Sequence, residues 1–299
     1  MDADLAQCAQ AGTVVVFYHP DNGCFARANR LAKFGPCVVV DNTGAERRSA
    51  APALDPNITY IANGVNQGVA TALNQGVDVL IRSGCRSAIL FDQDSEPSDD
   101  LLLQLPQLLD EQRAKGVRVA VVGPAYEDAR LGGTAPFVRF GYLKLQRIQP
   151  VGTALVAVDF LITSGSCINL DAWREIGPMD ETLFIDFVDL EWCVRARSKG
   201  YAVLGAPALR LQHELGDIPV SLFGRAYPRH SPLRHYYLFR NGVALIKRAY
   251  VPWSWKSTEL LKFPVRLVIY STLMHPRLTH LRLSLLGIWH GLLGRSGAF

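Results

Sequence analysis

Two carboxylates close an apolar run in the sequence Ile89-Leu-Phe-Asp92-Gln93-Asp94-Ser95. Because successive side chains of an extended chain alternate in direction, residues two positions apart point the same way. Asp92 and Asp94 are therefore expected to face one cleft, where one would meet a sugar or ribose and the other a divalent cation. Such hard oxygen ligands suit Mg²⁺ or Mn²⁺, which commonly also bind phosphate oxygens. A polar turn that merely ends a strand has a similar composition, so the spacing alone leaves both interpretations open.

The segments on either side of this pair predict an α/β fold with a mostly parallel, Rossmann-like sheet. Apolar runs predict five strands, at residues 13–18, 37–40, 58–61, 87–91 and 117–122. The segments between them predict helices, at residues 25–34, 68–82 and 101–115. Strands that alternate with helices in this way form a parallel sheet with helices on both faces.

The second half of the chain gives weaker signals. Residues 132–150 predict a loop or an irregular hairpin, and residues 156–162 predict a strand that runs into the small-residue turn at 163–166. Residues 184–195 predict a loop that enters a helix, and Gly200 follows the basic last turn of that helix.

Ligands of open parallel sheets bind beyond the carboxyl ends of the strands. Asp41 and Asp92 both follow such ends, which brings acids from two strands to one edge, as a nucleotide-sugar pocket requires. No G-x-G-x-x-G sequence follows the first strand, and no phosphate-binding lysine motif occurs. Both absences argue against a conventional dinucleotide site and against kinase or NTPase chemistry.

Composition indicates a folded protein that works in a reducing compartment. The 299 residues are 49% hydrophobic and 19% charged, which is enough apolar material for a substantial core. The six cysteines are scattered without a C-x-x-C pair, which argues against a zinc site or a disulfide framework and suits the cytosol. The acidic start Met1-Asp-Ala-Asp4 lacks the basic region of a signal peptide.

Charge is divided unevenly along the chain. Residues 218–299 carry twelve Lys or Arg against the single acid Glu259, which gives +11, whereas residues 1–217 sum to −7. We therefore expect a catalytic domain at 1–217 and a basic, aromatic helical extension at 218–299. Residues 260–274 and 281–293 predict amphipathic helices that either lie in the headgroup layer of a membrane or pack on the catalytic domain. Neither apolar stretch is long enough to span a bilayer.

Six motifs occur in the order found in one enzyme family. They are Asp41-Asn42, the pair Asn66-Gln-Gly68 and Asn74-Gln-Gly76, Asp92-Gln-Asp94, Ser164-Gly-Ser166, the acidic region 177–191, and the segment Arg234-His-Tyr236-Tyr-Leu-Phe-Arg240-Asn241. With these motifs, residues 13–248 resemble a family-2 glycosyltransferase of the GT-A fold, and most closely the rhamnosyltransferase branch. The resemblance implies the GT-A fold and an inverting transfer from a nucleotide sugar.

The resemblance also implies a role for individual residues. Asp189 corresponds to the catalytic base, with Asp186 and Glu191 as rivals, because Val188-Asp189 replaces the usual Glu-Asp pair of the family. Asp94 corresponds to the principal metal ligand, and His213 is placed to complete the metal site or to contact the leaving diphosphate. The residues implied in substrate binding are Asp41, Asn66, Asn74, Asp92, Ser166, Glu191 and Arg240.

The implied function is transfer of L-rhamnose from dTDP-L-rhamnose to a lipid-linked or growing surface polysaccharide, with Mn²⁺ or Mg²⁺ as cofactor. The basic extension would hold the enzyme at the inner, cytoplasmic face of the cell membrane. Three alternatives remain: the same fold with a UDP-hexose donor, a basic nucleic-acid-binding protein that uses the extension, and a non-catalytic scaffold. The extension has no recognisable nucleic-acid-binding motif, and the intact acids Asp92, Asp94 and Asp189 argue against a scaffold.

Overall fold

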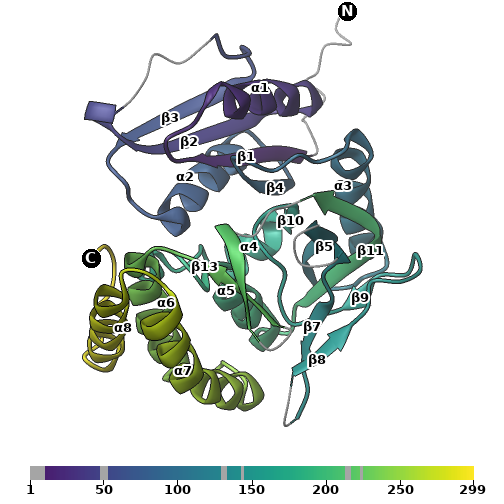
Figure 1. The fold of residues 1–299 in the computed structure, drawn as a ribbon. Helices are drawn as coiled ribbons and strands as arrows, with labels where there is room; N and C mark the ends of the chain where they lie inside the picture. Colours follow the sequence, from purple (N-terminus) through teal and green to yellow (C-terminus); the bar gives the residue numbers. More distant parts are fainter. Residues whose placement is uncertain (1–10, 48–52, 129–132, 143–144, 213–216, 223–224) are drawn as a thin grey trace, which may run out of the picture.

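The computed structural model describes residues 11–47, 53–128, 133–142, 145–212, 217–222 and 225–299. Within these ranges the main sheet has nine strands in the order β3-β2-β1-β4-β10-β5-β11-β9, and β6 pairs with β5. Helices cover both faces of the sheet, and three further helices lie together beside it (Figure 1). The expected α/β architecture with a mostly parallel sheet is confirmed.

The strands of the main sheet are β1 (Ala11–Phe17), β2 (Cys37–Gly44), β3 (Ile58–Gly64), β4 (Ser87–Asp92), β5 (Val119–Asp128), β6 (Gly133–Thr134), β9 (Val156–Ala157), β10 (Ser166–Asn169) and β11 (Ala202–Gln212). Two separate hairpins consist of β7 (Phe137–Phe140) with β8 (Leu145–Ile148), and β12 (Asp217–Leu222) with β13 (Arg225–Arg229). The helices are α1 (Asn22–Leu31), α2 (Val69–Arg82), α3 (Asp99–Ala114), α4 (Leu170–Ile176), α5 (Val188–Ser198), α6 (Pro232–Ile246), α7 (Trp253–Leu273) and α8 (Arg277–Leu292).

Two apolar layers hold the helices against the sheet. The layer on one face joins α2, α4 and α5 to the strands, and the layer on the other joins α1 and α3 to them. The central strands β1, β2 and β4 are parallel and contribute side chains to both layers. This two-sided burial explains why these strands are continuous Val, Ile and Leu runs rather than alternating ones. It also fixes the carboxyl ends of β1 and β4 side by side.

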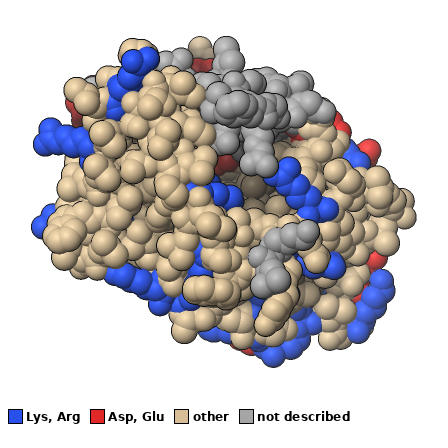
Figure 2. Space-filling view, turned by 60° about the horizontal axis from the view of Figure 1, so that its bottom comes forward, with Lys and Arg blue, Asp and Glu red and all other residues tan. Residues whose placement is uncertain are grey.

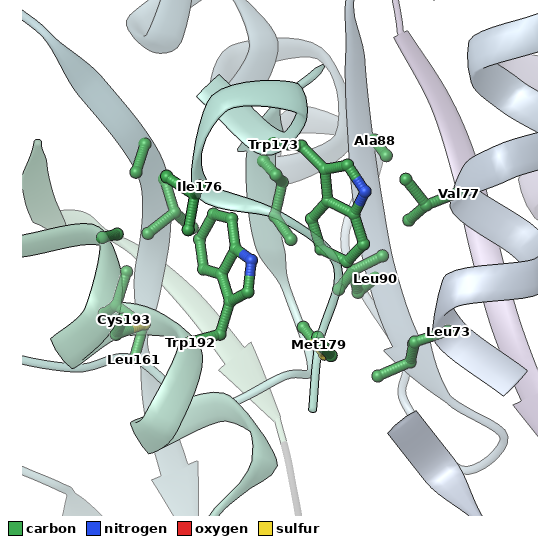
Figure 3. Packing of buried hydrophobic residues seen from close by; sticks show 14 of the residues in the cluster. Leu73, Val77, Ala88, Leu90, Leu161, Trp173, Ile176, Met179, Trp192 and Cys193 are labelled. Atoms are coloured by element: carbon green, nitrogen blue, oxygen red, sulfur yellow. The ribbon is translucent and has the colours of Figure 1, made fainter. Parts of the chain in front are cut away.

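Trp173 and Trp192 lie in the first of these layers, with ring centroids 5.4 Å apart. Figure 3 shows the two indoles facing each other among Leu73, Val77 and Met179. The Trp192 indole donates a hydrogen bond of 2.9 Å to the Gly177 carbonyl oxygen, which satisfies its polar group inside the core. Both tryptophans are therefore packing residues.

One predicted strand is wrong. Residues 156–162 form only the two-residue strand β9, and the chain then continues irregularly to the antiparallel strand β10. Asp159 ends the strand because its buried carboxylate accepts a hydrogen bond from the Phe140 amide and pairs with Arg197. The Asp159 amide donates to the Val138 carbonyl oxygen over 3.0 Å, so the chain leaves the edge of the main sheet for the β7–β8 hairpin. The predicted hairpin in 132–150 is confirmed as β7–β8.

The last three helices form a compact group. Gly287 and Gly291 let α8 approach α6, because a Cβ atom at these positions would lie 2.4 Å from the Tyr236 carbonyl oxygen and 2.7 Å from the Arg240 one. The two predicted amphipathic helices correspond to α7 and α8. Within the part of the chain that the structure describes, neither is long and apolar enough to cross a bilayer.

A buried histidine pair links α6 to α8 and predicts a pH-dependent stability. His235 Nδ1 lies 2.9 Å from His280 Nδ1, and its ring stacks on Tyr270 at 3.7 Å. Burial, with His280 beside it, lowers the pKa of His235 from 6.5 to about 3. Below pH 6.5 the unfolded chain binds a proton at His235, whereas the folded chain does not bind it until about pH 3. The contribution of neutral His235 to the free energy of unfolding is therefore fully present above pH 6.5 and falls as the pH is lowered.

We expect this histidine to remove about 2 kcal/mol from the free energy of unfolding between pH 7 and pH 5. Urea unfolding of the wild type and of His235→Phe at both pH values measures it, because phenylalanine keeps the ring but does not titrate. Equal losses of stability in the two proteins would contradict the assignment.

Candidate active site

A cavity of about 440 Å³ opens at the carboxyl ends of β1 and β4. Its walls come from those two strand ends, from the start of α2, from the turn before β10, from the segment that enters α5, and from α6. The residues that line it are Val16, Tyr18, Val69, Asp92, Gln93, Asp94, Ile162, Thr163, Ile185, Asp186, Phe187, Val188, Asp189 and Arg234. Asp92, Asp94 and Asp189, which the sequence assigns to sugar, metal and base, meet in this one cavity.

Ser164 fixes the end of β4. Its hydroxyl donates to Asp92 Oδ2 over 2.6 Å and accepts the Asp92 amide over 3.0 Å, and the Ser95 hydroxyl donates to it in turn over 3.0 Å. The next residue, Gly165, has φ +81, and a Cβ atom there would lie 2.8 Å from Pro124 Cγ. The small-residue turn thus brings the buried Ser164 hydroxyl against the Asp92 carboxylate.

Asp189 lies in the first turn of α5 and is half-buried on the cavity wall. Burial raises the pKa of its carboxyl to about 6, and the nearby charges of Asp92 and Asp186 act in the same direction. The Leu190 amide donates to Asp189 Oδ1 over 2.7 Å, which holds the carboxylate in place. A carboxylate whose pKa lies near the working pH is suited to accept a proton in catalysis.

The segment that leads into α5 has an unusual backbone. Phe184, Asp186 and Phe187 all have φ between 63° and 66°, a region that L residues with side chains rarely adopt. Each such residue costs about 1–2 kcal/mol and persists only where the surroundings enforce it. Asp186 also accepts a hydrogen bond of 3.1 Å from Arg234 Nε on α6, while burial raises the pKa of its carboxyl.

Arg234 is a cavity residue that sequence reasoning did not assign. It stands at the start of α6, well over a hundred residues from Asp94, and no local pattern marks it as facing the acids. Among the described residues that line the cavity, it is the one with a basic side chain. Its guanidinium partly balances the acids gathered there.

The predicted substrate residues near the first strands lie outside the lining of this cavity. Asp41 lies within β2, which continues to Gly44, so it does not follow the strand end as predicted; its carboxylate accepts hydrogen bonds from the Tyr60 hydroxyl at 2.5 Å and the Thr43 amide at 2.8 Å. Asn66 Oδ1 accepts the Gly68 amide over 3.0 Å at the start of α2. Asn74 exchanges hydrogen bonds of 2.9 and 3.0 Å with the backbone of Met179.

Ser166 lies on the far side of the small-residue turn. Its hydroxyl donates to the Ile162 carbonyl oxygen over 2.5 Å. Together with Ser164 it lines a second, much smaller cavity of about 40 Å³ beside β5 and β7. His213, the second predicted metal ligand, falls outside the described residues.

Glu191 and Arg240 do not reach the cavity and instead make buried structural contacts. Glu191 is fully buried, pairs with Arg195 at 2.8 Å and Arg248 at 3.2 Å, and accepts the Tyr250 hydroxyl over 2.5 Å. Arg240 is 1% exposed and donates to backbone oxygens of the segment before α5. In this structure Glu191 and Arg240 therefore hold elements of the fold together and do not line the cavity as the predicted substrate contacts would.

The donor set of the cavity fits a hard divalent cation. Asp92, Asp94 and Asp189 all line the cavity, and carboxylate oxygens are ligands that such a cation prefers. Within the described residues, no group of three or more His, Cys, Asp or Glu side chains is arranged to hold a metal ion. A cation here would therefore be held by the carboxylates of Asp92 and Asp94, and its other ligands would not come from the described residues.

The chain is similar in sequence to known glycosyltransferases. Residues 37–160 match the model of Glycosyl transferase family 2. Over 288 residues the chain is 28% identical to the dTDP-rhamnosyl transferase RfbF of Shigella flexneri. The aligned region covers 95% of this chain and 96% of RfbF.

Solved structures show the same fold at low identity. The structure of GalNAc-T7 with UDP, GalNAc and Mn²⁺ superposes with a TM-score of 0.53 and 13% identity over 92% of this chain, which spans 59% of that one. The structure of S. aureus TarS 1-349 superposes with a TM-score of 0.50 and 13% identity. The matched region covers 94% of this chain and 80% of the TarS chain. The predicted GT-A fold is confirmed. The chain is a glycosyltransferase with the GT-A fold, in which residues 37–160 match the family 2 domain.

Proposed function

We propose that this protein transfers L-rhamnose from dTDP-L-rhamnose, with inversion, to a hydroxyl group of a lipid-linked or growing surface polysaccharide. The observation that carries the proposal is the meeting of Asp92, Asp94 and Asp189 in one cavity at the carboxyl ends of parallel strands. Similarity to RfbF over nearly the whole chain supports the donor. The three acids provide a base for the acceptor hydroxyl and carboxylates that would hold a cation at the diphosphate, which are the two groups that a single displacement needs.

Asp189 is the base of this reaction. Its carboxylate accepts the proton of the acceptor hydroxyl while the acceptor oxygen forms a bond to the anomeric carbon. On the opposite face of the sugar the bond from that carbon to the diphosphate oxygen breaks, and dTDP leaves with the bonding electrons. Arg234 lies in the same cavity and favours the negative charge that develops on the leaving group.

Asp94 is the principal residue that would hold Mn²⁺ or Mg²⁺, with Asp92 beside it. When bound, such a cation neutralises charge on the diphosphate of the donor. Asp92 is already oriented by Ser164 and would contact the sugar, the ribose or metal-bound water.

Apolar side chains on the cavity wall support a deoxysugar over a UDP-hexose. Val16, Val69 and Ile162 line the cavity together with the acids. The methyl group of rhamnose can pack on such a wall, whereas the hydroxymethyl group of a hexose would lose hydrogen bonds to water there. A UDP-hexose remains the alternative donor, and the experiment below distinguishes it from dTDP-rhamnose.

Calorimetric titration with dTDP-rhamnose, dTDP and UDP-glucose, each with and without Mn²⁺, tests the proposal. We expect metal-dependent binding of both thymidine compounds and weaker binding of UDP-glucose. Preference for UDP-glucose would retain the glycosyltransferase and overturn the rhamnose donor. Failure of all three to bind would overturn the proposed site.

The C-terminal helices support a position at the cytoplasmic surface of a membrane. α7 exposes Leu261, Val265 and Val268 on one face, and α8 exposes Leu285 and Trp289 in the same spacing. Figure 2 shows a face on which Lys and Arg side chains are spread among uncharged residues, with few acids. Exposed apolar groups between basic ones fit an anionic lipid surface better than nucleic acid.

We expect the protein to float with vesicles that contain anionic lipid at low salt and to be released at high salt. The double variant Leu261→Asp/Val265→Asp should lose this binding and keep its affinity for dTDP, because neither residue lines the cavity. Wild-type protein that ignores the vesicles would refute the membrane surface.

A further inference from the structure

The segment before α5 carries backbone strain at the point where it supports the base. Three of the four residues from 184 to 187 have left-handed backbone conformations, and Phe187 begins α5 without a side-chain cap. Ile185, Asp186 and Phe187 line the cavity, and Asp189 follows within one turn of helix. Something outside this segment must hold it, because such conformations are not stable by themselves.

Two neighbouring residues of α6 hold the backbone of this segment. The Asn241 side-chain amide donates to the carbonyl oxygens of Leu183 at 2.8 Å and Ile185 at 2.6 Å, with the Asp186 oxygen at 3.2 Å. Its two amide hydrogens are shared among these three acceptors. Arg240 donates to the Thr182 oxygen at 3.1 Å and to the Leu183 oxygen at 2.9 Å.

The pair is itself rigid. Arg240 Nε donates to Asn241 Oδ1 over 3.0 Å, so each residue orients the other. The guanidinium also lies 4.8 Å from the centre of the Tyr237 ring, and that ring stacks on Phe184 at 5.0 Å. Asn241 and Arg240 are both 1% exposed, so their hydrogen bonds do not compete with water.

α2 supports the segment from the other side. The Val69 amide donates to the Phe184 carbonyl oxygen over 2.8 Å. Gly68 lies against Phe184 so closely that a Cβ atom there would be 2.6 Å from the ring and 2.7 Å from that oxygen. The Asn66 side chain and the Asn42 side chain each bond the backbone of Gly68. The segment is therefore held between α2 and α6.

We propose that Arg240 and Asn241 are positioning residues that fix the backbone of 182–186 so that the base on α5 is held at the cavity. The proposal rests on the proposed function for the identity of the base. Neither residue lines the cavity, so they act on the reaction through the backbone they hold and do not touch the sugar. This replaces the substrate contact that the sequence implied for Arg240.

Asn241→Leu tests the proposal, because leucine has a similar shape but no donor for the three carbonyl oxygens. Tyr236→Phe on the same helix is the matched control: it removes the 2.8 Å contact with His290 on α8 and leaves the segment before α5 untouched. Three quantities are measured for each protein, namely kcat for transfer, the Kd of dTDP with Mn²⁺, and hydrogen exchange of the amides of residues 185–191.

We expect Asn241→Leu to lower kcat about 100-fold, as loss of alignment by about 1 Å does, and to leave the Kd of dTDP within about twofold. Exchange at 185–191 should become about tenfold faster or more than in Tyr236→Phe. If exchange and kcat match the control, the pair does not position the base. A weaker Kd with an unchanged kcat at saturation would instead favour a direct contact of this pair with the substrate, as the sequence implied for Arg240.

Arg240→Lys covers the case in which Asn241→Leu does not fold. Lysine keeps the charge near Tyr237 and loses the planar guanidinium that reaches the carbonyl oxygens of Thr182, Leu183 and Gly297, so the same direction of change is expected in all three measurements. If the wild type transfers no sugar at all, the proposed function fails, whereas the exchange comparison still decides whether the pair holds the segment.

Discussion

Replacing Asp189 by asparagine is expected to lower kcat for sugar transfer by about 10³-fold, within the range that general-base removal produces. Asparagine has nearly the same shape and can still accept the Leu190 amide, so α5 should begin as before. It cannot accept the proton of the acceptor hydroxyl. Binding of dTDP should change little, which calorimetry on the same variant measures.

Asp186→Asn is the comparison for this variant. Asp186 lines the same cavity, but its carboxylate is already engaged by Arg234 at 3.1 Å. We expect a clearly smaller loss of kcat there than in Asp189→Asn. A larger loss at Asp186 would move the base to that residue.

The pH profile gives a second check on Asp189. Because burial raises its pKa to about 6 and the ionised form is the base, kcat/KM should rise as the pH increases through about 6 and then level off. A profile without this acidic limb would argue against Asp189 as the group that takes the proton.

Replacing Asp94 by alanine is expected to remove metal-dependent nucleotide binding. A cation held by Asp94 would neutralise charge on the diphosphate, so the Kd of dTDP in the presence of Mn²⁺ should rise about 100-fold. Removal of Mn²⁺ from the wild type with EDTA should have a similar effect. Calorimetry with dTDP measures both.

Gln93→Ala is the control, since Gln93 lines the cavity between the two acids but offers the Tyr18 amide an acceptor at 2.8 Å. It should retain metal-dependent binding. If Asp94→Ala binds dTDP with Mn²⁺ as tightly as Gln93→Ala does, Asp94 does not hold the cation.

Local pattern was sufficient for the parallel strands at the centre of the sheet and for the carboxylate pair. The runs at 37–40 and 87–91 are apolar on both sides, as is typical of strands buried on two faces. Asp92 had to follow the second of them, at the sheet edge where ligands bind. The antiparallel strand β10 was missed because its four residues sit beside a turn of small residues and make no periodic signal.

Side-chain direction explains the misplacement of Glu191. Residues two apart on a helix lie about 200° apart around its axis, so Asp189 and Glu191 on α5 point to nearly opposite sides. If one faces the cavity, the other faces the core, where Glu191 pairs with Arg195 and Arg248. A helical wheel of residues 188–198 would have given this result from the sequence.

The place of Arg234 and Arg240 could not be predicted locally. Both lie on α6, six residues apart, yet one reaches the cavity and the other is buried against backbone oxygens. The difference depends on how α6 docks against a segment some fifty residues earlier, which only the tertiary structure defines.

The hydrogen bonds from Arg240 and Asn241 to the segment before α5 end on carbonyl oxygens, which every residue type provides. The side chains of Ile185 and Phe187 are therefore not needed for that anchoring, although they line the cavity. Phe187 also packs edge-on against Trp255 of α7, with ring centroids 5.6 Å apart, so its side chain is part of the scaffold. Substitutions at 185 can therefore alter the shape of the cavity while the backbone anchoring is retained. This position thus offers a route to reshaping the site that leaves its frame in place.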